Sequence, residues 1–247
     1  MKKLKQSLFK MCENICIAKD VYKMVLEGDT SALTAPGQFI NIKIDGLFLR
    51  RPISVCDYDD KTITIIYKVV GKGTEKMKEM KKGEELDILT GLGNGFDISK
   101  AGKKALCIGG GVGTPPMYNL AKKLIEKGVD VTVVLGFASK EDVFYEEEFK
   151  KLGALVFVAT NDGSYGTKGF VTDVMKNLDG YDYFYTCGPE PMLKAVYNAT
   201  NTSGELSFEE RMGCGFGACM GCSCKTKYGN KRICKDGPVL LKEEIIW

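Results

Sequence analysis

Four cysteines near the C-terminus place the strongest constraint on this chain. Cys214, Cys219, Cys222 and Cys234 follow the spacing C-x4-C-x2-C-x11-C, which is typical of plant-type [2Fe–2S] clusters. The run between Arg211 and Cys222 is rich in glycine. Glycine lets the backbone turn tightly and direct its N–H groups at sulfur without Cβ clashes. The spacing therefore predicts that these four thiolates converge on two irons and that the chain carries electrons.

Three other uses of these cysteines remain open at this point. A structural zinc site also takes four cysteines, usually as paired C-x2-4-C knuckles, but only Cys219 and Cys222 form one. A disulfide framework needs an oxidising compartment, and the stretch Met1–Ser7 is charged without the apolar segment of a secretory leader. Cys224 is a fifth cysteine in the segment and could replace Cys222, but the C-x2-C step would then become C-x4-C.

The composition excludes several classes of chemistry. The 247 residues include no histidine, which excludes Rieske ligation, Ser-His or Cys-His catalysis and His-ligated zinc. The sequence is 44% apolar without an apolar run near 18 residues, so we expect a cytoplasmic protein without a membrane partner. A formal net charge of +3 is too small to indicate a nucleic-acid partner.

The first hundred residues alternate between apolar and polar side chains, as strands do. The clearest stretches run from Val21 to Leu26, from Gln38 to Ile44 and from Thr62 to Val70, with Gly, Pro or Asp-Asp between them. This period-two pattern predicts an antiparallel β-barrel over residues 1–100. A helical stretch is expected from Thr74 to Met80.

From about Gly102 the pattern changes to that of an α/β protein. Apolar residues at helical spacing follow a short apolar run and a glycine loop; they are Met117, Leu120, Ala121, Leu124 and Ile125. The expected strands of this part are Ala105 to Ile108, Val129 to Leu135, Leu155 to Ala159 and Tyr181 to Thr186. The alternation of strands with helices predicts a parallel-sheet nucleotide-binding domain over residues 101–205, followed by a small cluster domain over residues 206–247.

The glycine loop between the first of these strands and its helix predicts a nucleotide site. Bare N–H groups and a helix N-terminus favour a pyrophosphate, and Pro115 or Pro116 suits the first helical turn. The residues assigned to NAD here are Gly109, Gly110, Gly111, Val112, Gly113 and Thr114. A tight turn without a ligand is the alternative. Glu141 and Asp142 come slightly late for a ribose contact and Lys140 lies beside them, so the preference for NAD over NADP stays open.

The pattern G-x-G-x-x-P of Gly111, Gly113 and Pro116 resembles ferredoxin–NADP reductase-like proteins, in which a flavin barrel precedes a nicotinamide-nucleotide domain. The run Arg51-Pro52-Ile53-Ser54 is similar to the flavin motif of that family, although Ile53 stands where an aromatic residue is common. The resemblance implies that Arg51 binds the FAD pyrophosphate, for which a bidentate guanidinium is suited, and that Ser54 approaches the flavin ring.

Two further segments carry the same resemblance. The stretch from Tyr67 to Thr74 is similar to the segment that passes the isoalloxazine. The resemblance implies that FAD contacts Lys68, Val69, Val70, Gly73 and Thr74. The turn Cys187-Gly188-Pro189 is similar to the family turn beside the nicotinamide. Without the motif, Cys187 would be a small buried hydrophobe.

Taken together, the barrel, nucleotide and cysteine motifs resemble the electron-transfer subunits of type 1B dihydroorotate dehydrogenases over essentially the whole chain. The resemblance implies a subunit with FAD, a [2Fe–2S] cluster and NAD, bound to a separate FMN-containing catalytic subunit as a dimer of heterodimers. Electrons would pass from dihydroorotate through FMN, the cluster and FAD to NAD+ during pyrimidine (UMP) biosynthesis. The general base for dihydroorotate is then expected in the other subunit.

Two alternatives belong to other classes. The small subunit of an NADH-dependent ferredoxin–NADP reductase or of a sulfide dehydrogenase-like complex has the same flavin and nucleotide domains. Such proteins tend to carry aspartate at the first cluster position, where this chain has Cys214. A redox-sensing iron–sulfur or zinc module without enzymatic activity is the second alternative, and the flavin segments argue against it.

Overall fold

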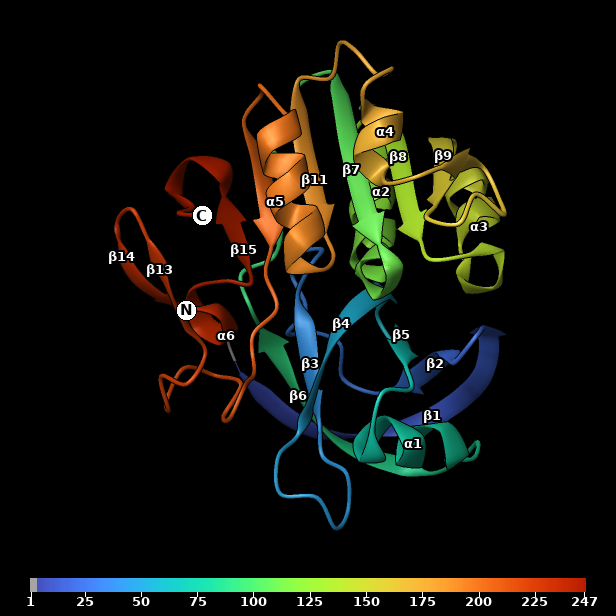
Figure 1. Cartoon of the computed structure of the whole chain (residues 1–247). Coiled ribbons are helices and arrows are strands. Elements are labelled where there is room, and N and C mark those ends of the chain that lie inside the picture. The colour runs from blue at the N-terminus through green and yellow to red at the C-terminus, as the bar shows by residue number, and fades with distance from the viewer. Residues whose placement is uncertain (1–3) are drawn as a thin grey trace.

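The computed structural model describes residues 4–247 and consists of a β-barrel and an open sheet, with the C-terminal segment beside both (Figure 1). The first three residues of the predicted 1–100 barrel and of the Met1–Ser7 stretch lie outside the described range. Among residues 4–247, no helix combines the length and apolar character needed to span a bilayer.

Six antiparallel strands close the barrel in the order β1-β2-β5-β4-β3-β6. Their bounds are β1 (Lys5–Ala18), β2 (Val21–Glu27), β3 (Phe39–Ile42), β4 (Arg51–Tyr58), β5 (Thr62–Lys68) and β6 (Glu85–Leu92). Alternate residues of β5, Ile63, Ile65 and Tyr67, are buried in the barrel core, as the period of a strand requires. The helix α1 (Lys72–Glu79) follows β5. The predicted antiparallel barrel is therefore confirmed.

A seven-stranded sheet forms the second part in the order β10-β9-β8-β7-β11-β12-β15, with all neighbours parallel except β12 and β15. The strands are β7 (Lys104–Gly110), β8 (Asp130–Phe137), β9 (Leu155–Thr160), β10 (Thr167–Lys168), β11 (Tyr183–Cys187), β12 (Gly204–Ser207) and β15 (Val239–Leu241). From β7 the chain adds β8, β9 and β10 on one side of that strand. It then returns and adds β11 on the other side. The predicted parallel-sheet fold is thus confirmed, and its switch point lies between β7 and β11.

Helices cover both faces of this sheet. One face packs against α2 (Thr114–Glu126) and α3 (Glu146–Lys151), and the other packs against α4 (Val171–Met175) and α5 (Glu190–Ala199). The short 3-10 turns are η1 (Gly111–Gly113), η2 (Lys140–Asp142) and η3 (Lys242–Glu244). Asp57 of the barrel accepts a hydrogen bond of 2.6 Å from Asn119 Nδ2 and pairs with Lys122 Nζ at 2.9 Å. The helix α2 therefore joins the sheet to the barrel.

The C-terminal segment is bound to the sheet at both of its ends. It leaves β12, forms the hairpin of β13 (Ser223–Thr226) and β14 (Gly229–Arg232), passes through α6 (Ile233–Asp236) and returns as β15 beside β12. Asn94, between barrel and sheet, accepts the Val239 N–H at 3.0 Å and donates to the Val239 carbonyl at 2.7 Å. The predicted boundary between residues 205 and 206 falls within β12, so the three-domain division stays a proposal.

Candidate functional site

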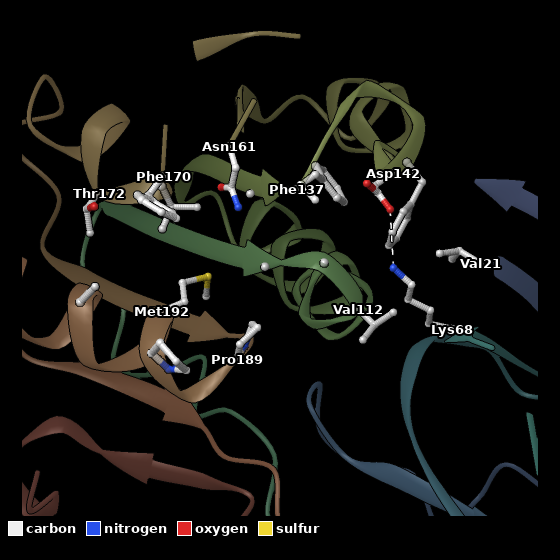
Figure 2. A pocket seen from close by; sticks show the side chains of 18 residues that line it. Val21, Lys68, Val112, Phe137, Asp142, Asn161, Phe170, Thr172, Pro189 and Met192 are labelled. Carbon is white, nitrogen blue, oxygen red and sulfur yellow. Dashed lines mark ion pairs between the residues drawn. The ribbon is translucent and has the colours of Figure 1, made fainter. Parts of the chain in front are cut away.

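A cavity of about 500 Å³ opens at the carboxyl ends of β7 and β8, near the switch point of the sheet (Figure 2). Open α/β sheets bind ligands at this place, and the volume is that of a typical small-molecule site. Of the residues predicted to bind NAD, four line this cavity: Gly110, Gly111, Val112 and Pro189. The structure therefore brings the glycine loop and the turn after β11 to one site.

Three glycines of the loop allow close packing against neighbouring segments. A Cβ on Gly113 would stand 2.2 Å from the carbonyl oxygen of Cys187, and a Cβ on Gly110 would stand 2.4 Å from Met192 Sδ. A Cβ on Gly109 would stand 2.8 Å from the Cα of Thr114. Because no side chain fits at these positions, the loop lies directly against the Cys187 turn.

Charged residues close one side of this first cavity. Lys68 from β5 and Asp142 from η2 both line it, and their Nζ and Oδ1 atoms are 3.6 Å apart (Figure 2). Ser139 donates to Asp142 at 2.9 Å and fixes that carboxylate. Lys140 is not among the lining residues, and its backbone N–H donates to Ser164 at 2.8 Å. Asp142 thus reaches the cavity despite its late position in the sequence.

Several further residues of this cavity were not predicted from the sequence, among them Val21, Phe137, Asn161, Phe170 and Met192. Asn161 directly follows β9 and Phe170 directly precedes α4. A position at the end of a strand or at the start of a helix was therefore the only sign in the sequence that these two residues could line a site.

A second cavity, of about 250 Å³, lies between the barrel and the sheet. It collects the predicted flavin residues Pro52, Ile53, Ser54, Lys68, Val70 and Thr74. Cys187 lines this second cavity and not the first, and Lys68 and Val112 line both. The two cavities therefore share a wall made by the glycine loop and β5. We call the first the nucleotide cavity and the second the flavin cavity.

The start of α1 is built to hold an anion at the edge of the flavin cavity. A Cβ on Gly73 would stand 2.1 Å from Arg51 Nε, so the guanidinium lies directly over this turn. Arg51 also donates to the carbonyl of Leu49. The Thr74 hydroxyl accepts the Val70 N–H at 2.9 Å and donates to the Gly71 carbonyl at 3.0 Å. A helix N-terminus beside a permanently charged guanidinium suits a phosphate.

Cys187 is a buried thiol. Burial, with a smaller effect of the nearby Glu209 charge, raises the pKa of the Cys187 thiol to about 12. A thiol is nucleophilic only as thiolate. Cys187 is therefore a small, uncharged residue at the wall of the flavin cavity.

The predicted cluster cysteines lie as two pairs. The thiols of Cys214 and Cys219 interact, as do those of Cys222 and Cys234. Each iron of a [2Fe–2S] cluster takes two protein ligands, whereas zinc draws four around one point. Within residues 4–247, no three His, Cys, Asp or Glu side chains converge as ligands of a single ion would. The two pairs match the two-and-two ligation of a [2Fe–2S] cluster, and the charge of Cys214 also raises the pKa of Cys234 in the other pair.

Backbone N–H groups support thiolate character at the first pair. Burial alone would raise the pKa of Cys214, but N–H donors of Cys219, Phe216 and Ala218 outweigh it and lower that pKa to about 6. The Ala218 N–H lies 3.2 Å from Cys214 Sγ. Burial and the neighbouring thiols raise the pKa of Cys234 to about 12. A bound metal would remove that proton, because metal-bound thiols are deprotonated.

Cys224 lies on β13, opposite Lys231 of β14, and outside both thiol pairs. The geometry therefore favours Cys222 as the ligand.

Arg232 was not predicted from the sequence. Its Nη1 donates to the carbonyl of Gly217 at 2.8 Å, and its Nε lies 3.2 Å from Asp236 Oδ2. It ties the loop of the first cysteine pair to the helix that carries Cys234.

Comparison with known proteins agrees with this geometry. A family model described as an oxidoreductase NAD-binding domain matches residues 107–198, and one described as the iron-sulfur cluster binding domain of dihydroorotate dehydrogenase B matches residues 209–246. The dihydroorotate dehydrogenase B (NAD(+)) electron transfer subunit of Fusobacterium nucleatum subsp. nucleatum is 49% identical over 248 residues, which cover 94% of this chain and 95% of the relative. This chain belongs to the family of dihydroorotate dehydrogenase B electron transfer subunits. A member from Geobacillus sp. (strain WCH70) is 45% identical, covering 98% of this chain and 99% of its own.

Solved structures show the same fold. A chain from the structure of the NADH-dependent reduced ferredoxin-NADP oxidoreductase is 31% identical, with a TM-score of 0.89, and the match covers 98% of this chain and 90% of that one. It represents the alternative raised from the sequence, and its identity is well below that of the dihydroorotate dehydrogenase B relatives. The FAD/NAD-binding domain of a Vibrio cholerae nitric oxide dioxygenase, at 21% identity, a TM-score of 0.63 and coverage of 78% and 91%, shows the fold alone. The predicted family is confirmed: the chain is an oxidoreductase subunit for electron transfer.

Proposed function

We propose that this chain carries electrons between a [2Fe–2S] cluster and NAD by way of FAD. One observation carries the proposal. The flavin cavity is lined at once by the barrel motif, by Cys187 next to the glycine loop, and by Glu209, Glu210 and Met212, which lead into the cluster cysteines. A flavin there would lie between the two other sites. When bound, it exchanges single electrons with a cluster and a hydride with NAD.

The residues fit each of these groups. For the cluster we propose Cys214, Cys219, Cys222 and Cys234, which are already paired two by two. For FAD we propose Arg51 over the bare N-terminal turn at Gly73, with Ser54, Lys68 and Thr74 in the cavity wall. For NAD the glycine loop offers its N–H groups and Pro189 lines the opposite side. Cys187 leaves room between the nucleotide and flavin cavities.

The partner follows from the family. The relatives are described as the electron transfer subunit of dihydroorotate dehydrogenase B (NAD(+)), so we propose that this chain binds an FMN-containing catalytic subunit in the cytoplasm, as a dimer of heterodimers. In that complex it would deliver the electrons of dihydroorotate to NAD+ in pyrimidine biosynthesis.

The test is co-expression of this chain with the catalytic subunit and anaerobic purification. We expect two irons and two acid-labile sulfides per chain, bound FAD, and dihydroorotate-dependent reduction of NAD+. A ferredoxin assay on the same sample distinguishes the proposed function from its alternative. Reduction of ferredoxin by NADH without dihydroorotate activity would favour the NADH-dependent ferredoxin–NADP reductase class. Absence of iron and sulfide would refute the proposal.

A further inference from the structure

The outer face of the barrel strand β3 buries one polar side chain among apolar ones. Ile40 and Ile42 lie in the barrel core, and Phe39 and Asn41 alternate with them on the opposite face of the strand. Phe39 and Leu89 of β6 belong to an apolar cluster that includes residues of the C-terminal segment. Asn41 is only 2% exposed. A buried amide thus lies where the barrel meets the segment that carries the cluster cysteines.

Two contacts place the side chain of Asn41 against the start of the cluster loop. Its Nδ2 donates to the carbonyl oxygen of Cys214 at 3.5 Å. A Cβ on Gly215 would stand 2.4 Å from the same Nδ2, and the φ of Gly215 is +80°, which favours glycine. The amide therefore fills the space beside Gly215, and a side chain at residue 215 would displace it.

The Asn41 amide has few partners for a buried group. Within residues 4–247, its Oδ1 is buried without a hydrogen-bond partner. Exchanging the two ends of the amide would set Oδ1 against the Cys214 carbonyl oxygen, so the orientation with Nδ2 toward the loop is the favourable one. Burying an amide in this way costs free energy that an apolar side chain would avoid. Stability therefore does not account for Asn41, which leaves its contact with the cluster loop as the reason for a polar residue here.

The Cys214 carbonyl belongs to the first peptide of a loop whose N–H groups point at sulfur. The N–H groups of Ala218 and Cys219 lie 3.2 Å and 3.5 Å from Cys214 Sγ. A donor at the Cys214 carbonyl fixes the plane of the peptide that follows, because a carbonyl and the next N–H lie in one rigid plane. Hydrogen bonds to the ligand sulfurs help to set the reduction potential of an iron–sulfur cluster. The contact with Asn41 can therefore act on the cluster through its first ligand.

The barrel side of this contact is continuous with the flavin motif. Asn41 pairs with Pro52 on β4 and with Leu89 on β6. Arg50 donates to the backbone carbonyls of Asn41 and Asp87 at 3.4 Å and 2.8 Å, and its Nη2 lies 2.9 Å from Asp87 Oδ2, which holds β3 and β6 together at this point. Pro52 lines the flavin cavity, whereas Asn41 does not. Asn41 thus connects the cluster loop to the strand beside the flavin motif without facing the flavin cavity itself.

We propose that Asn41 is a positioning residue that seats the cluster loop on the flavin barrel and raises the reduction potential of the cluster. By holding the Cys214 carbonyl, it keeps the N–H groups of the loop directed at Cys214 Sγ. These donors stabilise the more negative, reduced form of a bound cluster. The inference rests on the proposed function, because it needs a [2Fe–2S] cluster held by these cysteines.

The experiment is an anaerobic redox titration of wild type and Asn41→Leu, each in the complex with the catalytic subunit. The EPR signal of the reduced cluster and the visible band of the flavin are followed in the same sample. Leucine keeps the branch at Cγ and removes both polar atoms. The equilibrium constant for placing one electron on the cluster should fall about 10-fold, which corresponds to a potential lower by about 59 mV. The flavin potential should stay at the wild-type value, because Asn41 does not line the flavin cavity.

Asn14→Leu is the matched control, an identical change in the same barrel. The Asn14 amide donates to the Met77 carbonyl at 2.9 Å and accepts from the Tyr67 hydroxyl at 3.0 Å, so its loss should lower the melting temperature and leave the cluster potential unchanged. Asn41→Leu should show the opposite pattern. Its melting temperature should equal or exceed that of wild type, because a buried amide with few partners is removed. This contrast distinguishes positioning of the cluster from a general loosening of the barrel.

The outcomes separate this inference from the proposed function. An unchanged cluster potential in Asn41→Leu, or an equal lowering in both variants, would overturn the inference and leave the proposed function standing. A wild-type complex without iron and sulfide would defeat the proposed function itself. If Asn41→Leu lost the cluster, Asn41→Gln, which keeps an amide donor, should retain it. A Gln variant with no more iron than the Leu variant would also overturn the inference.

Discussion

Arg51 lies across Gly73 at the first turn of α1, so closely that a Cβ on Gly73 would come within 2.1 Å of Arg51 Nε. The guanidinium can hold this position only because residue 73 has no side chain. Gly73→Ala is therefore expected to displace Arg51 from the helix N-terminus. Losing a charged hydrogen bond to the phosphate should raise the Kd of FAD about 10-fold, or ~1.4 kcal/mol, measured by flavin fluorescence during titration of the apoprotein.

Gly71→Ala is the matched control two residues away. An added Cβ at Gly71 would meet no atom within 4 Å, and the φ of 174° is extended backbone that alanine adopts without strain. FAD affinity should stay at the wild-type value. Equal weakening in both variants would show that the helix start, and not the position of Arg51, determines binding.

The two thiol pairs make a prediction about the fifth cysteine. Cys222→Ser breaks the pair with Cys234, so iron and acid-labile sulfide should fall to near zero after anaerobic purification. Cys224→Ser should retain both, because Cys224 lies outside the pairs. The reverse outcome would identify Cys224 as the ligand. Whichever of the two variants lacks the cluster, NADH should still reduce its flavin and bleach the flavin absorption.

Local patterns in the sequence predicted the strands and helices in which buried side chains recur at regular spacing. The alternation from Thr62 to Val70 corresponds to β5, and the apolar spacing from Met117 to Ile125 lies within α2. The C-terminal forty residues lacked such a period, because β15 is only three residues long and is defined by pairing with β12 more than thirty residues earlier. Long-range pairing of this kind leaves little trace in a local window.

The same distinction applies to the candidate site. Motifs predicted the glycine loop and the flavin residues, since each motif is continuous in sequence. Arg232 was missed because its hydrogen-bond partner, the carbonyl of Gly217, lies in another part of the cluster segment. Arg232 does not differ in type or spacing from a surface charge, and only the fold gives it this neighbour.

Arg232 is predicted to hold the cluster loop. Arg232→Gln removes the side-chain hydrogen bond to the Gly217 carbonyl and the side-chain contact with Asp236, while the backbone N–H of residue 232 still donates to Asp236. The loop of Cys214 and Cys219 should then loosen, and cluster loss in air, followed by the visible iron–sulfur absorption, should become several-fold faster. Lys225→Gln removes an equal charge from the other strand of the same hairpin and serves as control. Equal acceleration in both variants would attribute the effect to charge alone.

Glu205 predicts a pH dependence of stability. Its side chain is buried and accepts the Asp97 N–H at 2.9 Å. Burial, assisted by the negative charge of Asp97 and opposed by this hydrogen bond, raises the pKa of Glu205 to about 7. Between its ordinary value of 4.5 and about 7, the folded chain keeps a proton that the unfolded chain releases. This contribution to stability is therefore complete at low pH and is lost as pH rises through that window.

Glu205→Gln should remove this dependence, because glutamine keeps an oxygen for the Asp97 N–H without carrying a charge. At pH 8 the variant should unfold at a higher temperature than wild type, by an amount corresponding to at most about 3 kcal/mol. At pH 5 the two melting temperatures should nearly coincide, since wild-type Glu205 is then protonated in the folded state. The measurement is thermal unfolding of the complete complex at both pH values, with Glu243→Gln as the exposed control. A constant difference between Glu205→Gln and wild type at both pH values would show that packing, and not ionisation of Glu205, separates them.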